Sequence, residues 1–130
     1  MLVLSKINSV REKIKQWRQN GEKIGFVPTM GALHTGHISL VDKAVAGNEV
    51  VVVSIFVNPT QFNNATDLKN YPRDTKGDIS LLKDADCDVV FIPAVEEIYE
   101  KDYLLNLDFG YLENTMEGKF RPGHFKGVGL

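Results

Sequence analysis

The stretch "VVVVSIFV", residues 50–57, is an almost unbroken apolar run with the length of a β-strand. Successive side chains of a strand point to opposite faces, so a strand with one solvated face alternates apolar and polar residues. This run does not alternate, since Ser54 is its one polar residue. The pattern therefore predicts a strand buried on both faces, as in a parallel sheet that helices cover on both sides.

Helix and strand patterns precede this run. The spacing Ser9-Val-Arg-Glu12 is that of a capping box and predicts the start of a helix. We expect that helix to run to about Asn20 and to stop at Gly21. The stretch "KIGFVP", residues 23–28, then has the length and composition of a short buried strand.

Two further helices and a third strand complete the alternation. Apolar residues at helical spacing predict a helix that begins near His37, and the spacing Thr75-Lys-Gly-Asp78 predicts the start of another. The stretch "CDVVFIP", residues 87–93, supplies the third strand, and residues 103–109 alternate well enough for one more. The order αβαβαβ predicts an α/β fold with a parallel sheet and helices on both faces.

Length and charge narrow the class of protein. The chain has 130 residues, of which 43% are hydrophobic, and this suffices for one domain with its own core. A net charge of -2 gives no field that would attract nucleic acid or an anionic membrane. The apolar runs are too short to span a bilayer, and the N-terminus lacks the order of a signal peptide. We therefore expect a cytoplasmic protein that binds neither nucleic acid nor membrane.

The loop "TMGALHTG", residues 29–36, is the first candidate for a functional site. Ligands of open α/β sheets bind beyond the carboxyl ends of the strands, which is where this loop is expected. Its glycines allow close backbone approach, and the N-terminus of the following helix favours an anion such as phosphate. The loop is not a P-loop, because His37 and Ile38 stand where that motif has Lys and Ser or Thr.

His34 and His37 allow three interpretations. A metal pair would need further ligands, and neither the histidines nor the aspartates of the chain show a recognised metal-site spacing. Structural histidines, hydrogen-bonded within the loop, are the second interpretation. The clustering with Gly31 and Gly36 favours the third, a nucleotide site in which imidazole N–H groups bind phosphate oxygens.

The loop also carries a resemblance to a known family. "PTMGALHTGH", residues 28–37, resembles the signature of the pantothenate synthetase (pantoate–β-alanine ligase) family of the nucleotidyltransferase superfamily, which is named for its His-x-Gly-His motif. Four more stretches match that family in order, and together they cover nearly the whole chain: "VSIFVNPTQF" (53–62), "YPRD" (71–74), "FIPAVEEIY" (91–99) and "EGKFRPGHFKGV" (117–128).

The resemblance implies a Rossmann-like domain of a ligase. Such an enzyme condenses pantoate with β-alanine through a pantoyl adenylate, consumes ATP with Mg²⁺, and releases AMP and pyrophosphate. The resemblance also implies a homodimer built through this domain and makes His34 and His37 the catalytic residues. The implied ATP-binding residues are Met30, Gly31, Ala32, Leu33, His34, Thr35, Gly36 and His37.

The same resemblance implies a substrate pocket. The Gln61 amide suits a hydroxy acid because it can donate to a carboxylate and accept from a hydroxyl. Each stretch also has a simpler interpretation, since methionine commonly fills cores and "YPRD" and "RPGHF" contain turn signals. The residues expected to contact pantoate or β-alanine are Gln61, Met30, Asn58 and Tyr71, and those expected to support the pocket wall are Arg121 and His124.

Members of the family are longer than this chain. Their second half brings a Lys-Asp segment and a Ser-Ser-Arg loop that close on ATP, and residues 1–130 match neither segment. We therefore expect residues 1–130 to be the N-terminal nucleotide- and pantoate-binding domain, without the C-terminal lid domain and not competent for turnover alone. Two alternatives stay open: a folded, self-associating domain without useful substrate binding, and another nucleotidyltransferase of the superfamily.

Overall fold

The computed structural model describes residues 1–62, 64–99 and 107–129. They belong to two compact units. The sheet unit comprises Met1–Phe56 and Pro72–Ile98, and the helical unit comprises Val57–Tyr71 and Tyr99–Leu130. All strands that the described residues form lie in the sheet unit. No helix in this part of the chain is long and apolar enough to cross a membrane.

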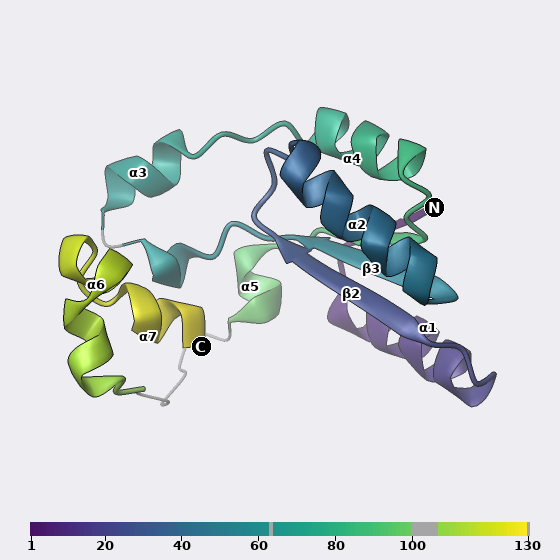
Figure 1. Cartoon of the computed structure of the whole chain (residues 1–130), viewed down its shortest axis with the longest axis horizontal. Helices are drawn as coiled ribbons and strands as arrows, with labels where there is room; N and C mark the ends of the chain where they lie inside the picture. The colour runs from purple at the N-terminus through teal and green to yellow at the C-terminus, as the bar shows by residue number, and fades with distance from the viewer. Residues whose placement is uncertain (63, 100–106, 130) are drawn as a thin grey trace. The chain divides into compact units, whose positions relative to one another are not determined.

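Four parallel strands form the sheet, in the order β1-β4-β3-β2 (Figure 1). The register places Val52 of the central strand β3 beside Val89 of β4. The parallel α/β sheet expected from the sequence is confirmed. One edge strand was not predicted, because a strand of 3 residues is too short for periodicity to reveal. The strands are β1 (Leu2–Leu4), β2 (Ile24–Thr29), β3 (Val50–Ile55) and β4 (Val89–Phe91).

Helices cover both faces of the sheet. In Figure 1, α2 (Thr35–Gly47) and α4 (Thr75–Asp84) lie over one face and α1 (Ile7–Gln19) lies over the other. A short helix, α5 (Val95–Ile98), follows β4. The expected layer of helices on each side of the sheet is therefore confirmed.

The central strand β3 contributes to a core on each face. Val51 and Val53 pack in one cluster with Val41 of α2 and Leu82 of α4. Their neighbours Val50 and Val52 point the other way and pack with Val89, against which the half-buried Trp17 of α1 lies. Every residue of β3 is buried, as the absence of alternation predicts.

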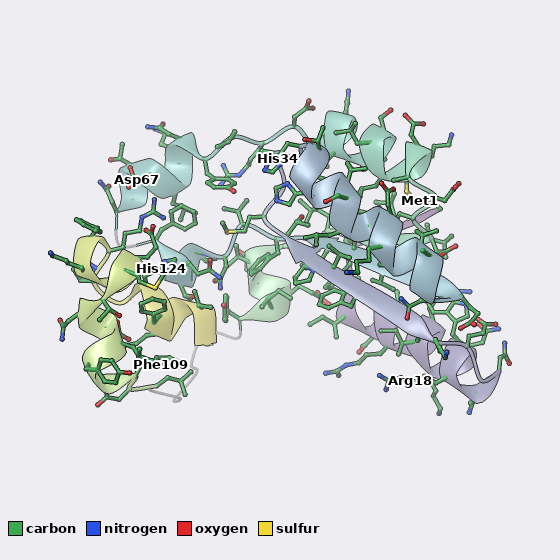
Figure 2. The ribbon with its side chains drawn as sticks, viewed as in Figure 1. Met1, Arg18, His34, Asp67, Phe109 and His124 are labelled. Carbon is green, nitrogen blue, oxygen red and sulfur yellow. The ribbon has the colours of Figure 1, made fainter. Side chains whose placement is uncertain are left out.

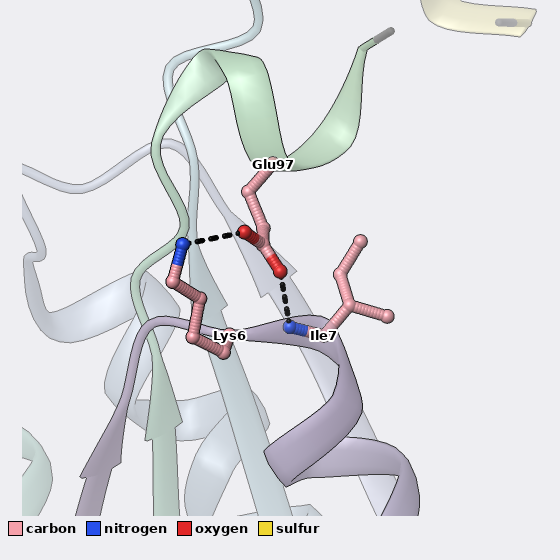
Figure 3. Close-up of polar contacts among 3 residues, drawn as sticks. All are labelled: Lys6, Ile7 and Glu97. Atoms are coloured by element: carbon pink, nitrogen blue, oxygen red, sulfur yellow. Dashed lines mark hydrogen bonds and ion pairs between the residues drawn. The ribbon is translucent and has the colours of Figure 1, made fainter.

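The predicted start of the first helix is wrong. Helix α1 begins at Ile7 rather than at Ser9, and its N-cap residue Lys6 makes no side-chain cap bond. The cap comes from α5 instead. Glu97 Oε1 accepts a hydrogen bond from the Ile7 amide at 2.8 Å, and its Oε2 pairs with Lys6 Nζ at 2.9 Å (Figure 3). A capping group from a distant part of the chain leaves no local pattern in the sequence.

The starts of α2 and α4 also differ from the predicted ones. Helix α2 begins at Thr35 with His34 as its N-cap, earlier than the expected start near His37. The N-cap of α4 is Asp74, whose Oδ1 accepts from the Gly77 amide at 3.0 Å, so the predicted capping box at Thr75–Asp78 is wrong. Aspartate is a preferred N-cap residue, and its use here leaves the Asp78 carboxylate available for other contacts.

Short helices make up the described part of the helical unit, and the sequence pattern did not predict them. The additional strand expected at 103–109 falls mostly outside the described residues, and 107–109 are irregular.

The helices of this unit pack closely. Gly127 lies so close to the Thr60 carbonyl that a Cβ atom would overlap it. The elements are η1 (Pro59–Gln61), α3 (Ala65–Asn70), η2 (Gly110–Asn114), α6 (Met116–Phe120) and α7 (His124–Gly129).

Candidate functional site

The loop between β2 and α2 leaves the carboxyl end of an edge strand, as expected of a ligand-binding loop in this fold. The Thr29 side chain fixes its first residues. Its hydroxyl donates to the Ser54 carbonyl of β3 at 2.8 Å and accepts from the Gly31 amide at 3.3 Å. Because Thr29 and Ser54 are both buried, these bonds tie the loop to the adjacent strand.

Two successive residues of this loop have a left-handed backbone. Gly31 has φ 81° and Ala32 has φ 52°. Glycine adopts this region freely, but for alanine it costs about 1–2 kcal/mol because its Cβ atom crowds the carbonyl oxygen. The loop therefore needs contacts that offset the strain at Ala32.

The Asp78 carboxylate supplies such contacts. It lies in α4, is 3% exposed, and accepts from the Ala32 amide at 3.0 Å and from the Leu33 amide at 2.7 Å. A hydrogen bond to a charged group contributes about 1.5–3 kcal/mol, so two of them outweigh the strain at Ala32. The sequence pattern did not predict this role. Its one signal was the i, i+4 spacing of Asp78 and the apolar Leu82, which places the aspartate on the inward face of α4.

His34 and His37 bond to the first turn of α2. The His34 ring accepts from the Gly36 amide at 3.1 Å through Nδ1, and the His37 ring accepts from the His34 amide at 3.3 Å through Nδ1. The ring centroids are 4.1 Å apart. Figure 2 shows His34 at the end of α2 where the loop from β2 arrives.

These bonds fix where each ring carries its proton. A nitrogen that accepts a hydrogen bond has no proton, so neutral His34 and His37 are both protonated on Nε2. The pKa of His37 is lowered by burial and by His34, while Asp78 raises it by a smaller amount. His37 is therefore mostly neutral at pH 7, and its Nε2–H is a donor that needs no extra proton.

The start of α2 has further features that suit an anion. His34, Thr35 and Gly36 are exposed, whereas the amides of Gly36 and His37 are already bonded, to His34 Nδ1 and to the His34 carbonyl. The helix dipole places partial positive charge at the same end. Beside this end lies a cavity of about 600 Å³, lined by His34, Thr35, Ile38, Ser39, Asp42 and Leu81. Imidazole N–H groups and a helix N-terminus together suit a phosphate or another anion.

The other predicted residues lie in the helical unit. Gln61 is half-buried in η1, and its carbonyl is 3.2 Å from His124 Nδ1. Tyr71 packs edge-on against Phe62, with ring centroids 5.6 Å apart. The Arg121 side chain is 3.6 Å from Glu117, one turn earlier on the surface. The structure thus groups Gln61 with His124 in one unit and Met30 with the histidine pair in the other.

The Asn58 side chain forms hydrogen bonds within the helical unit. Its Oδ1 accepts from Thr60 Oγ1 at 2.7 Å and from the Tyr99 hydroxyl at 2.8 Å. Its Nδ2 donates to the Gly127 carbonyl at 3.0 Å. Asn58 therefore ties η1, which carries Gln61, to α7 and to Tyr99.

Metal chemistry has no dedicated site in this part of the molecule. Among residues 1–62, 64–99 and 107–129, no group of three or more His, Cys, Asp or Glu side chains could hold an ion. Magnesium commonly binds through one or two carboxylates together with substrate phosphates. The described residues therefore do not form a protein cage for Mg²⁺.

The fold and the loop define the class of protein. The chain is an α/β protein with a parallel sheet and a candidate anion-binding loop. This loop has a left-handed backbone at the carboxyl edge of the sheet, and two histidines cap the helix that follows it. Comparison with known proteins identifies the family within that class. The model of the pantoate-beta-alanine ligase family matches residues 2–130, and the chain belongs to this family.

Individual relatives agree with this assignment. The chain is 48% identical to the pantothenate synthetase of Porphyromonas gingivalis and 50% identical to that of Phocaeicola vulgatus. Each alignment covers 98% of this chain and 46% or 45% of the relative, so the chain spans about half the length of the curated relatives it matches.

Solved structures show the same likeness. The pantoate-beta-alanine ligase of Francisella tularensis, crystallised in complex with beta-gamma ATP and beta-alanine, matches 98% of this chain and 49% of its own, with TM-score 0.90 and 48% identity. The pantothenate synthetase of Thermus thermophilus matches 98% of this chain and 45% of its own, with TM-score 0.81 and 42% identity.

Proposed function

We propose that this chain is the N-terminal, nucleotide- and pantoate-binding part of a pantothenate synthetase. The observation that carries the proposal is the histidine pair at the start of α2, where the caps leave each Nε2–H as a donor. Relatives named pantothenate synthetase support the reaction, and the Francisella tularensis complex with ATP and beta-alanine supports two of its substrates.

The proposed reaction has two steps. The pantoate carboxylate attacks the α-phosphorus of ATP, the bond to the β-phosphate breaks, and pyrophosphate leaves with its electron pair. The β-alanine amine then attacks the carbonyl of the pantoyl adenylate, AMP leaves, and the amine loses a proton. His34 and His37 donate hydrogen bonds from Nε2 to phosphate oxygens, whose negative charge grows as the first bond breaks. Both steps also gain from holding the reactants in position.

The lowered pKa of His37 favours hydrogen-bond donation over proton transfer as its role. A general acid must carry the proton that it gives away, and a His37 ring mostly neutral at pH 7 would have to give up its Nε2 proton and become an anion. As a neutral donor it stabilises negative charge without losing that proton. We therefore propose that His37 acts as an electrostatic stabiliser.

The pantoate contacts that we propose in the helical unit centre on Gln61. Gln61 would bind the hydroxyl and carboxylate of pantoate, with Tyr71 beside it. Asn58 would act mainly by fixing η1, because its amide is already bonded to Thr60, Tyr99 and Gly127. His124 would support Gln61 through the contact to its carbonyl, and Arg121 would support the adjoining wall.

Three further parts of the proposal concern the surroundings of the enzyme. Magnesium would arrive on the ATP phosphates, neutralise part of their charge, and need few protein ligands. The protein would act in the cytoplasm and form a homodimer through this domain. Sedimentation of the purified chain tests the last point, and a strictly monomeric result at high micromolar concentration would count against the dimer.

Ligand titration of this chain, followed by amide NMR, tests the proposed function. A non-hydrolysable ATP analogue should shift the amide signals of residues 30–37, and pantoate should shift those around Gln61. AMP should compete with the ATP analogue. If neither ligand shifts any signal at millimolar concentration, the chain is a folded domain without useful substrate binding. If the nucleotide binds but pantoate does not, the proposed pantoate contacts around Gln61 are wrong.

A further inference from the structure

We propose that Asp78 is a positioning residue that holds the loop before α2, and thereby sets the place of the His34 and His37 rings. This inference rests on the proposed function for its catalytic meaning. Its structural part depends only on contacts within the sheet unit. The mechanism above gives Asp78 no role, although a buried carboxylate is costly to keep.

The geometry of the carboxylate carries the proposal. One oxygen, Oδ1, accepts from the Leu33 amide at 2.7 Å, and the other, Oδ2, accepts from the Ala32 amide at 3.0 Å. Two adjacent amides therefore point at one side chain, as they would toward a bound anion. At 3% exposure, Asp78 has little water to replace these bonds if they are lost. Both oxygens are thus committed to the loop.

The position of these two amides explains why the bonds matter for the histidines. Leu33 directly precedes His34, whose own amide donates to the His37 ring. A shift of the Leu33 amide therefore moves the N-cap of α2, and with it the bond that sets the His37 tautomer. The Asp78 carboxylate thus connects α4 to the donor geometry at the start of α2.

Gly31 leaves room for the carboxylate in this arrangement. A Cβ atom at Gly31 would lie 3.1 Å from Asp78 Oδ2 and 3.1 Å from Ile55 Cγ2, tighter than an ordinary contact. Gly31 also has φ 81°, which other residues rarely adopt. The glycine of this loop is therefore needed for Asp78 to approach, as well as for the turn itself.

Asp78→Asn tests the inference with almost no change of shape. An asparagine can accept one of the two amide hydrogen bonds, but its NH₂ group then faces the other N–H, so one backbone donor loses its partner. In the ligand-free chain we expect amide exchange at Ala32 or Leu33 to become about tenfold faster or more. The pKa of His37 should also fall, because Asp78 raises it in the native chain.

Asp74→Ala is the matched control. It removes the N-cap of the same helix, so it weakens α4 without touching the loop. If Asp78 acted only by stabilising α4, Asp74→Ala would change the amide exchange rates of the loop and the pKa of His37 as much as Asp78→Asn does. Equal effects of the two variants would therefore overturn the positioning role. An effect confined to Asp78→Asn would support it.

Two additional measurements keep the test decisive. If Asp78→Asn does not fold, the native chain is measured instead. A scalar coupling between the Leu33 nitrogen and the Asp78 Cγ would show their hydrogen bond directly, and its absence overturns the inference.

Titration with α,β-methylene ATP then separates the two proposals. If the native chain does not bind this analogue, the proposed function fails while the loop data still decide the structural role. If it binds, Asp78→Asn should weaken binding about tenfold or more, and unchanged affinity would overturn the link to the histidines.

Discussion

In each histidine at the start of α2, the two ring nitrogens have different tasks. Nδ1 accepts a hydrogen bond from a backbone amide and is part of the helix cap, whereas Nε2 carries the proton of the neutral ring. The structural and the nucleotide-binding interpretations of these residues are therefore compatible. The sequence could suggest each of them, but it could not show that one ring can serve both.

Replacing His37 by Ala should weaken binding of a non-hydrolysable ATP analogue to this chain. The change removes the Nε2–H that we propose as a donor to phosphate, and the acceptor for the His34 amide. A hydrogen bond to a charged group contributes about 1.5–3 kcal/mol, so we expect the dissociation constant to rise about ten- to hundredfold. Isothermal titration calorimetry measures this change.

The control for this substitution is Lys43→Ala, an exposed position on the same helix. It removes a charge from α2 without touching the loop, and we expect a change of less than about threefold at moderate salt. If His37→Ala binds the analogue as well as the native chain does, His37 has only its capping role.

At the scale of the element, sequence patterns predicted those helices and strands that depend on interactions between neighbouring residues. Strand β3 was identifiable because every residue of it is buried, and α1 because Ile14 and Trp17, both half-buried, recur at helical spacing. The helix starts were less predictable, since Glu97, which caps α1, lies in α5 and is distant from α1 in the sequence. Asp78 was misassigned to a cap for the same reason, because its partners are distant in sequence.

Glu97→Gln should lower the thermal stability of the chain at neutral pH. The pKa of Glu97 is lowered by the hydrogen bond from Lys6 and by the bond from the Ile7 amide. A group with a lowered folded pKa stabilises the fold above its unfolded value of 4.5, and this contribution is lost as pH falls through the folded pKa. Circular dichroism melts at pH 7 and at a series of lower pH values should therefore show a difference between native and variant that is largest at pH 7 and shrinks as pH falls below 4.5.

Glu96→Gln is the neighbouring control, because Glu96 is exposed. Its melting temperature should follow that of the native chain at all of these pH values. A Glu97→Gln difference that persists undiminished below pH 4 would mean that shape, rather than charge, makes the Glu97 contact important.

Gly127→Ala should destabilise the helical unit. The new methyl group would overlap the Thr60 carbonyl and crowd the Gln61 amide, so α7 would have to move away from η1. Overpacking of this kind costs about 1–3 kcal/mol. Gly47→Ala is the control, because a Cβ there meets nothing within 4 Å, and it should be neutral or slightly stabilising. Chemical denaturation of both variants measures the difference, and equal stability would contradict the close contact of α7 with η1.

At the scale of the whole molecule, the chain has a sheet unit with a core on each face, but it spans about half the length of its curated relatives. The sequence predicted the sheet and its two layers of helices, because burial on both faces of β3 can be recognised from composition alone. It did not reveal the division into two units. That division depends on which segments pack together, and 57–71 joins 99–130 across a long gap in the sequence.

The last prediction is that the purified chain folds and binds pantoate weakly, yet does not make pantothenate at a measurable rate. Folding is expected because the sheet has its own covering helices and buried core. Turnover should fail for an electrostatic reason. When pyrophosphate leaves, negative charge gathers on the β-phosphate, and the resemblance places the lysine and arginine that offset it in the second half of the family. Losing two such stabilisers at about 3 kcal/mol each slows the chemistry roughly 10⁴-fold. Water entering an open site would also hydrolyse the adenylate. AMP release from pantoate, β-alanine, ATP and magnesium measures the rate. A rate within about tenfold of a full-length relative would exceed this 10⁴-fold deficit and show that residues 1–130 hold the complete site.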